Sequence, residues 1–180
     1  MTVQDDFLRE TIERAAAVFE GFKIEAVGDR IVMTPQSDIQ GWTVRRILNA
    51  IEDSGIDEDR FLADVLIRFP GEAPRCPDVA IMEEGAEKPY SHEALLAAVE
   101  VVSTKQDAND YEIKVRQYAR FGVPAYLIVD PFEGVCHLLS LPEGDEYTSC
   151  RKFTYGATVT LNLADGSKVE IPTDKFKRWN

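Results

Sequence analysis

The chain contains little cysteine and little histidine. Its 180 residues include three cysteines, Cys76, Cys136 and Cys150, and two histidines, His92 and His137. Three scattered cysteines are too few for a disulfide framework, and so few histidines also disfavour a zinc site. Because disulfide frameworks belong to oxidising compartments, this composition indicates a reducing cytoplasm.

Long apolar runs and a targeting segment are also missing from the sequence. No run approaches the roughly 20 apolar residues of a membrane-spanning helix. Asp5 and Asp6 make the start of the chain acidic, where a secretory signal would have basic and apolar blocks. We therefore expect a cytoplasmic protein without membrane association. The length suits one well-cored domain and is short for two, so we expect a single domain over residues 1–180.

Positive charge is scarce. The chain has 20 lysines and arginines against 32 aspartates and glutamates, and a formal net charge of −12. Nonspecific affinity for DNA comes mostly from neutralised phosphates, so this balance opposes easy nucleic-acid binding. A local basic patch can coexist with an acidic total, and the candidates are Arg45, Arg46, Lys175, Lys177 and Arg178. The alternative is that both groups are solvated surface charge, which is the usual meaning of such a pattern.

Hydrophobic periodicity and turn residues predict an α/β fold. Helices are expected at 5–20, 38–53 and 108–121, with Asp38 as the N-cap of the second and Gly122 ending the third. Strands are expected at 22–27, 30–34, 63–69, 77–83, 96–102, 125–130, 134–141, 145–153, 157–162 and 168–171. A turn at Gly28-Asp29 joins the first two. The order predicts a mixed central sheet flanked by helices, with β-rich ends.

Two carboxylates on predicted apolar strands are the strongest functional signal. Asp78 follows Pro77 at the start of one strand, and Glu100 lies among valines and alanines in the next. A buried strand normally excludes an unpaired charge, so such side chains usually serve chemistry. The alternatives are that Asp78 belongs to a turn, where aspartate after proline is common, and that Glu100 faces solvent. Apolar neighbours on both sides of Glu100 favour a sheet buried on both faces.

Together, the two carboxylates could hold a hard divalent cation, with the backbone carbonyl of Val101 as a third oxygen ligand. A metal there would lower the pKa of a bound water and neutralise charge on a reacting phosphate. The pattern therefore admits phosphodiester hydrolysis. Such chemistry also calls for a nearby cation to stabilise the transition state.

Lys114 is the candidate for that cation. Asp110, Lys114 and Tyr118 are spaced four apart in the predicted helix 108–121, so they share one face. This helix follows the Glu100 strand directly, and Lys114 can therefore point back toward the sheet end that carries both carboxylates. The alternatives are a surface salt bridge between Lys114 and Asp110 and a core position for Tyr118. On residue types alone, a metal-dependent enzyme is only modestly favoured over an α/β domain without such a site.

Read together, these segments resemble the Uma-type family of restriction-endonuclease-like proteins, a branch of the PD-(D/E)XK nuclease superfamily. The resemblance runs in order along nearly the whole chain, and the combined pattern is specific although each motif alone is not. Its segments are the hairpin at 25–35, the Pro-Asp strand at 76–80, Val-Glu-Val-Val-Ser at 99–103 followed by Asp110, Lys114 and Tyr118, and the closing strand at 122–131.

The resemblance implies a restriction-endonuclease-like mixed sheet flanked by helices, with an N-terminal helix and a β-hairpin added. It also implies nuclease chemistry on DNA with Mg²⁺, or Mn²⁺, as the cofactor. Asp78, Glu100 and Lys114 become the catalytic set, and Asp78, Glu100 and the Val101 carbonyl the metal ligands. The superfamily lysine normally stands two residues after the glutamate, where this chain has Val102. Lys114 looks like its migrated equivalent.

A second departure concerns Gln40, which occupies a place near the start of the second helix where family members often carry histidine. Glu25, Gln40, Asp110 and Tyr118 are possible accessory residues of the site. The first hypothesis is a magnesium-dependent DNA endonuclease, expected as a homodimer by analogy with related nucleases. The rival is a catalytically degenerate nuclease fold that acts as an interaction module. The acidic charge and Gln40 favour the rival, and the intact Asp78, Glu100 and Lys114 favour the enzyme.

Overall fold

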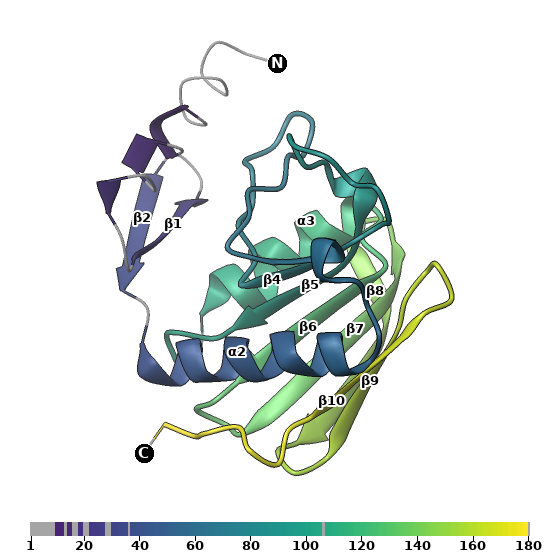
Figure 1. The fold of residues 1–180 in the computed structure, drawn as a ribbon. Helices are drawn as coiled ribbons and strands as arrows, with labels where there is room; N and C mark the ends of the chain where they lie inside the picture. Colours follow the sequence, from purple (N-terminus) through teal and green to yellow (C-terminus); the bar gives the residue numbers. More distant parts are fainter. Residues whose placement is uncertain are drawn as a thin grey trace.

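A six-stranded mixed sheet forms the centre of the computed structural model (Figure 1). The structure describes residues 10–12, 14–15, 18–19, 22–27, 30–35, 37–105 and 107–179. The strands of the sheet lie in the order β3-β4-β5-β6-β7-β8, and two separate two-stranded sheets are β1-β2 and β9-β10. This arrangement confirms the predicted α/β class with a mixed central sheet.

The elements have the following bounds. The central strands are β3 (Phe61–Ala63), β4 (Val79–Met82), β5 (Leu95–Val101), β6 (Ala125–Asp130), β7 (Val135–Glu143) and β8 (Glu146–Thr154). The smaller sheets comprise β1 (Phe22–Val27) with β2 (Arg30–Pro35), and β9 (Thr158–Asn162) with β10 (Lys168–Pro172). The helices are α2 (Asp38–Asp53) and α3 (Lys114–Arg120), with short 3₁₀ turns at Glu58–Arg60 and His92–Ala94 and a π-helical turn at Asn109–Ile113.

One strand pair makes the sheet mixed. β5 and β6 are parallel, whereas all other neighbours in the central sheet are antiparallel. Parallel neighbours need a crossover connection, and α3 with its preceding turn supplies it. The crossover thereby places α3 directly after the strand that carries Glu100.

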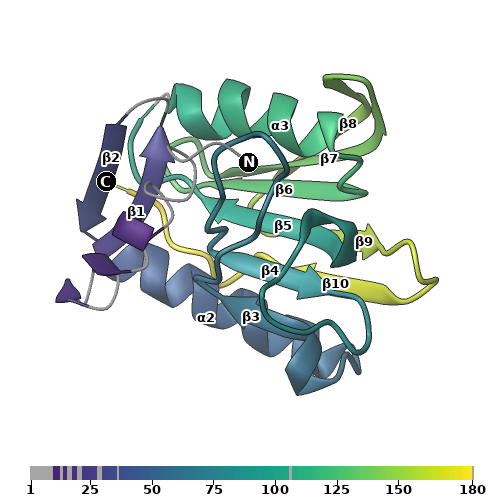
Figure 2. The same ribbon diagram turned by 90° about the horizontal axis from the view of Figure 1, so that it is seen from above.

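The sheet is buried on both faces, between α2 and α3 (Figure 2). Along β5, Val99 and Val101 belong to the core on the α2 side, which β9 and β10 also line. Ala98 belongs to the core on the α3 side. Because side chains alternate along a strand, Glu100 continues the Ala98 series toward α3. The continuous apolar composition of β5 follows from this double burial.

The second predicted helix is confirmed with both of its bounds, but its N-cap was predicted wrongly. Ser37, not Asp38, is the N-cap, and its hydroxyl accepts a hydrogen bond from the backbone N–H of Gln40 at 3.2 Å. Asp38 instead lies in the first turn, where a carboxylate still interacts favourably with the helix dipole. Buried residues of α2 recur at helical spacing, which is why its extent could be predicted from the sequence.

The strand expected at 63–69 is wrong. The structure has β3 at Phe61–Ala63, and Asp64 then takes a left-handed backbone conformation with φ of 51°. A non-glycine residue at positive φ cannot continue a strand. Ile67 and Arg68 form only isolated bridges, to Arg75 and Ser91.

The third helix begins differently from the prediction. Residues 109–113 form a π-helical turn, and regular α-helix starts only at Lys114. The backbone N–H of Lys114 bonds to the carbonyl of Asn109, five residues earlier. Gly122 then ends the helix as expected, with φ of 70°. Single π-turns inside helices occur frequently at functional sites.

Two expectations at the N-terminus fall wholly or largely outside the described residues. The helix expected at 5–20 is described only in fragments, and the turn at Gly28-Asp29 is not described. Strands β1 and β2 are present and pair antiparallel, as the hairpin prediction required. Among the described residues, no helix is both long and apolar enough to span a membrane.

The cysteines give a simple test of this core. Burial, with a smaller contribution from Asp130, raises the pKa of the Cys136 thiol to about 12, whereas Cys150 is exposed. Since the thiolate is the reactive form, iodoacetamide at pH 8 should modify Cys150 and leave Cys136 intact in the folded protein. Peptide mass spectrometry of native and urea-unfolded samples would check this. Modification of Cys136 before Cys150 in the native protein would contradict the fold at β7.

Candidate active site

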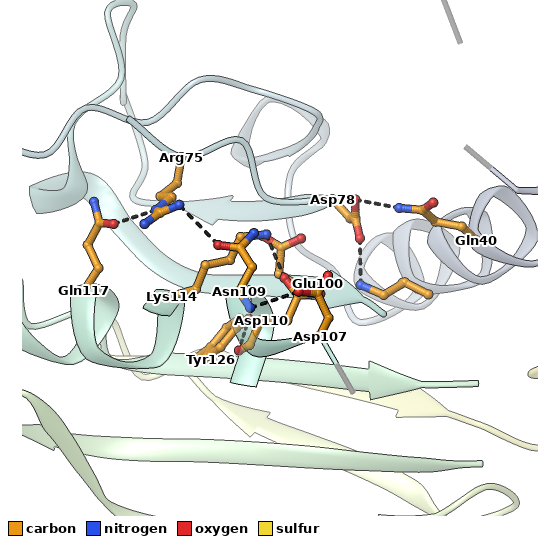
Figure 3. A network of polar contacts seen from close by, with 11 residues as sticks. Gln40, Arg75, Asp78, Glu100, Asp107, Asn109, Asp110, Lys114, Gln117 and Tyr126 are labelled. Atoms are coloured by element: carbon orange, nitrogen blue, oxygen red, sulfur yellow. Dashed lines mark hydrogen bonds and ion pairs between the residues drawn. The ribbon is translucent and has the colours of Figure 1, made fainter. Parts of the chain in front are cut away.

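Asp78 is held in place at the entrance to β4. Its side chain is 1% exposed. The Oδ2 atom accepts a hydrogen bond from the backbone N–H of Val101 at 2.6 Å, and Oδ1 accepts one from the Gln40 side-chain amide at 3.1 Å (Figure 3). Hydrogen bonds to the ionised form favour a charged carboxylate despite burial. Asp78 is therefore a fixed, buried carboxylate immediately before β4 and not part of an exposed turn.

Glu100 lies on the neighbouring strand at the same level of the sheet. Val79 of β4 pairs with Val99 of β5, and extending this antiparallel register by one residue places Asp78 opposite Glu100. Glu100 is also 1% exposed. The solvent-facing alternative for this residue is thus excluded.

Lys114 reaches this buried carboxylate from the start of α3. Its ammonium nitrogen lies 2.8 Å from Glu100 Oε1 and 2.8 Å from Asp110 Oδ1. The lysine side chain is 1% exposed. The expected approach of Lys114 to Glu100 is confirmed, and so is its pairing with Asp110. The latter is a buried contact and not the surface salt bridge that the spacing alone suggested.

Two tyrosines pack beneath the cluster. The hydroxyl of Tyr126 donates to the backbone carbonyl of Asp110 at 3.0 Å, which fixes the π-helical turn on β6. Tyr118 is fully buried and contacts the Tyr126 ring edge-on, with centroids 4.9 Å apart. Tyr118 thus occupies the core position that was the alternative to an accessory role in the site.

Gln40 and Glu25 were the other candidate accessory residues. Gln40 is 3% exposed and bonds directly to Asp78, so it belongs to the site. Its Oε1 atom is buried and has no hydrogen-bond partner among the residues that the structure describes. Glu25 lies on β1, and its side chain is outside the described part of the chain.

A second buried cation, Arg75, was not predicted from the sequence. It is 3% exposed, and its Nε donates to Gln117 Oε1 at 2.5 Å while a terminal nitrogen contacts Asn109 Oδ1 at 3.5 Å. Gln117 in turn donates to the backbone carbonyl of Ala73 at 2.8 Å. Arg75 thereby ties the segment before Asp78 to the turn before Lys114. Its position three residues before Asp78 was the only signal in the sequence.

Replacing Arg75 with alanine should destabilise the fold by about 2–3 kcal/mol, because hydrogen bonds of charged groups contribute this much and their buried partners would be left unsatisfied. Lysine should not restore stability, since it lacks the planar fork that spans both amides. Urea denaturation would measure the change. Arg45→Ala, at an exposed arginine, is the matched control and should stay within about 0.5 kcal/mol. Equal effects for the two alanine variants would contradict the structural role of Arg75.

The donor atoms of the cluster are of the type that a hard divalent metal binds. Asp78 and Glu100 offer carboxylate oxygens, and the unpartnered amide oxygen of Gln40 lies on the residue that bonds to Asp78. Mg²⁺ takes oxygen ligands and usually keeps several waters, so one or two protein carboxylates suffice. Within the described ranges, no group of three histidine, cysteine, aspartate or glutamate side chains is arranged to hold a metal. The Val101 backbone is fixed beside Asp78 by its N–H, and the ligand role of its carbonyl stays a prediction.

Comparison with known proteins places the chain in a family. The Uma2 family model, described as "Putative restriction endonuclease", matches residues 9–172. The chain belongs to the Uma2 family. This confirms the resemblance that the sequence motifs carried, and the matched range includes every candidate site residue. The roles of those residues stay predictions.

A solved structure supports the fold of this Uma2 member. It is described as a putative nuclease belonging to DUF820 from Anabaena variabilis, with a TM-score of 0.54 and 16% sequence identity. The similarity covers 77% of this chain and 80% of that chain. At this identity the likeness shows a shared restriction-endonuclease-like fold and not a shared activity. A search of curated proteins gave no match.

Proposed function

We propose that this Uma2 member is a metal-dependent endonuclease that hydrolyses phosphodiester bonds in DNA. One observation carries the proposal: Glu100 and Lys114 meet at 2.8 Å in a nearly solvent-free cluster that Asp78 adjoins. Three separate elements, the entrance to β4, the end of β5 and the start of α3, bring these residues together. Membership of a family described as "Putative restriction endonuclease" supports the same chemistry.

In this proposal, Asp78, Glu100 and the carbonyl of Val101 hold Mg²⁺ or Mn²⁺. The bound metal would supply a Lewis acid and lower the pKa of a coordinated water. The chain's own residues position the reaction: the Val101 N–H and the Gln40 amide fix the Asp78 carboxylate in one orientation. Lys114 contributes a compact positive charge where charge develops on the phosphate.

The donor types of the cluster support a cation site. Three carboxylates, Asp78, Glu100 and Asp110, are buried there together with the ammonium of Lys114. Carboxylate oxygens are the ligands that hard divalent cations take. The second carboxylate on Lys114, Asp110, would keep the lysine in place when Glu100 turns to a metal.

A non-catalytic interaction module is the second candidate. The observation that favours it is the Gln40 contact, because an amide donor occupies one oxygen of Asp78 in a place where family members often carry histidine. The net charge of −12 also opposes binding to a polyanion. In this alternative the Lys114 cluster only stabilises the α3 crossover.

Cleavage of supercoiled plasmid DNA tests the two candidates. With Mg²⁺ or Mn²⁺ the protein should convert supercoiled plasmid to open-circular and linear forms, and EDTA should stop the reaction. The Glu100→Gln variant, purified in parallel, controls for contaminating nucleases. Cleavage that survives in this variant, or no cleavage by the wild-type protein with either metal, would favour the interaction module.

A homodimer is part of the proposal, because paired subunits can cut both strands and two-fold dimers are the commonest soluble oligomers. Multi-angle light scattering should then give a mass near twice the 20.2 kDa of the chain. A monomer at micromolar concentration would remove the dimer from the proposal and leave a nicking activity.

A further inference from the structure

The solvent-facing side of α2 carries a group of cationic and aromatic residues. Trp42, Arg45, Arg46 and Asn49 line a shallow depression of about 170 Å³, and all four are exposed. Their spacing of three and four residues places them on one face of the helix. The buried residues of α2, which include Gln40, occupy the opposite face. We call the exposed group the α2 patch.

The C-terminal tail adds a further cation to the α2 patch. The ammonium of Lys177 lies 4.9 Å from the centroid of the Trp42 ring, a cation–π distance. The tail is anchored on both sides of this lysine: Phe176 is buried in the core, and Trp179 stacks on Phe132 with centroids 5.6 Å apart. Both ribbon views show the tail ending beside the start of α2 (Figures 1 and 2).

The two arginines of the α2 patch have no carboxylate partner in the part of the chain that the structure describes. Other arginines in this acidic protein do pair, as Arg60 does with Asp165 and Arg120 with Asp145. Arg45 and Arg46 are thus two exposed arginines without a carboxylate partner among the described residues, beside an exposed indole, and the exposed Asp38, Glu52 and Asp53 flank them on the same helix.

The α2 patch lies on the same helix as Gln40, on the opposite face. Trp42 comes two residues after Gln40, so the patch begins about 3 Å further along the axis of the helix whose first turn contacts Asp78.

We propose that the α2 patch and Lys177 bind the phosphate backbone of duplex DNA. This inference rests on the proposed function, since it assigns a contact surface to the proposed substrate. Guanidinium groups bind phosphate oxygens in a bidentate manner, and the Asn49 amide adds a neutral donor. The Trp42 ring holds the Lys177 ammonium at the edge of the arginine pair, where it extends the cationic surface.

Fluorescence anisotropy with a short fluorescein-labelled duplex tests the proposal. Binding would be measured in EDTA, so that metal-dependent cleavage cannot occur, at salt concentrations from about 50 to 200 mM. The Arg45→Ala/Arg46→Ala variant should weaken binding at the lowest salt by about tenfold or more. The plot of log K against log salt has a negative slope, and the variant should make this slope shallower by about 2. The control Arg151→Ala/Lys152→Ala removes two exposed charges from β8, which is the edge strand opposite β3 in the central sheet. It should leave the slope unchanged.

A second pair of variants tests the role of Trp42. Lys177→Ala should lower the salt slope by about 1, and Trp42→Ala should have nearly the same effect because it releases Lys177. The double variant should bind no more weakly than either single variant. If the indole–ammonium contact only anchors the tail, Lys177→Ala will lower the thermal unfolding midpoint and leave DNA binding unchanged, which would overturn the role of Lys177.

The outcomes separate this inference from the proposed function. Duplex binding that depends on Arg45 and Arg46, without cleavage of plasmid by the wild-type protein, would keep the inference and reject the nuclease. No duplex binding by the wild-type protein, an unchanged slope in the α2 variant, or an equal loss in the β8 control would overturn the inference. If the inference holds, cleavage assays with the Arg45→Ala/Arg46→Ala variant should show a higher KM and an unchanged kcat.

Discussion

Replacing Lys114 with alanine should lower the rate of DNA cleavage by roughly 10²-fold or more, the scale of losing one transition-state charge contact. The ammonium of Lys114 lies 2.8 Å from Glu100 Oε1, and the lysine is 1% exposed. Single-turnover cleavage of plasmid with saturating Mg²⁺ would measure the effect. Arginine should not restore activity, because its broad planar fork replaces a compact point charge.

Metal binding separates a catalytic from a structural role of Lys114. Calorimetry should show that Mg²⁺ affinity in the Lys114→Ala variant is unchanged or higher, because a cation that competes for Glu100 has been removed. The matched control is Lys152→Ala, an exposed lysine on β8, which should retain full activity. A Lys114→Ala variant that folds, binds metal and cleaves at the wild-type rate would show that the buried lysine only stabilises the crossover.

Glu100→Gln is expected to abolish both cleavage and calorimetrically detectable Mg²⁺ or Mn²⁺ binding, and Asp78→Asn should do the same, because each removes a proposed charged metal ligand. The exposed Glu143 on β7 offers a control in Glu143→Gln, which should retain binding. Metal binding with wild-type affinity in both site variants would contradict the proposed ligand set.

The stability of Glu100→Gln without metal gives an independent result. Two uncompensated neighbouring carboxylates would repel each other, and neutralising one would raise the free energy of unfolding. In the structure, however, Lys114 compensates Glu100 while the Val101 N–H and Gln40 bond to Asp78. We therefore expect a decrease. It should be smaller than the about 3–5 kcal/mol of breaking a buried ion pair completely, since Asp110 still pairs with Lys114.

The parts of the fold that repeat a simple pattern could be predicted from the sequence. α2 has buried residues at helical spacing, and β6 is a continuous apolar run ended by Pro131, so both were predicted with their observed bounds. Glu100 stood out because a charge within such a run needs a reason. These signals are local, and they depend on burial that composition already reveals.

Other features depend on contacts between distant segments, and no local pattern encodes them. The left-handed Asp64 ends β3 early, although its neighbours have the composition of a strand. Arg75 looks like a surface charge until Gln117, 42 residues later, bonds to it. The α2 patch likewise required the fold, because Trp42 and Lys177 are separated by most of the chain.

The π-helical turn before α3 affects the direction in which Lys114 points relative to the strand that carries Glu100. A π-turn holds one residue more than an α-turn, and one residue corresponds to about 100° of rotation around a helix axis. With the backbone of Asp110 held by Tyr126, regular α-helical winding from Asn109 would place Lys114 at a different rotation about the helix axis relative to Glu100. The winding of five residues therefore sets the rotational phase of α3. In this chain, the alignment of the Glu100 carboxylate with the Lys114 ammonium depends on the rotation of α3 about its axis. The number of residues between Glu100 and Lys114 does not determine it.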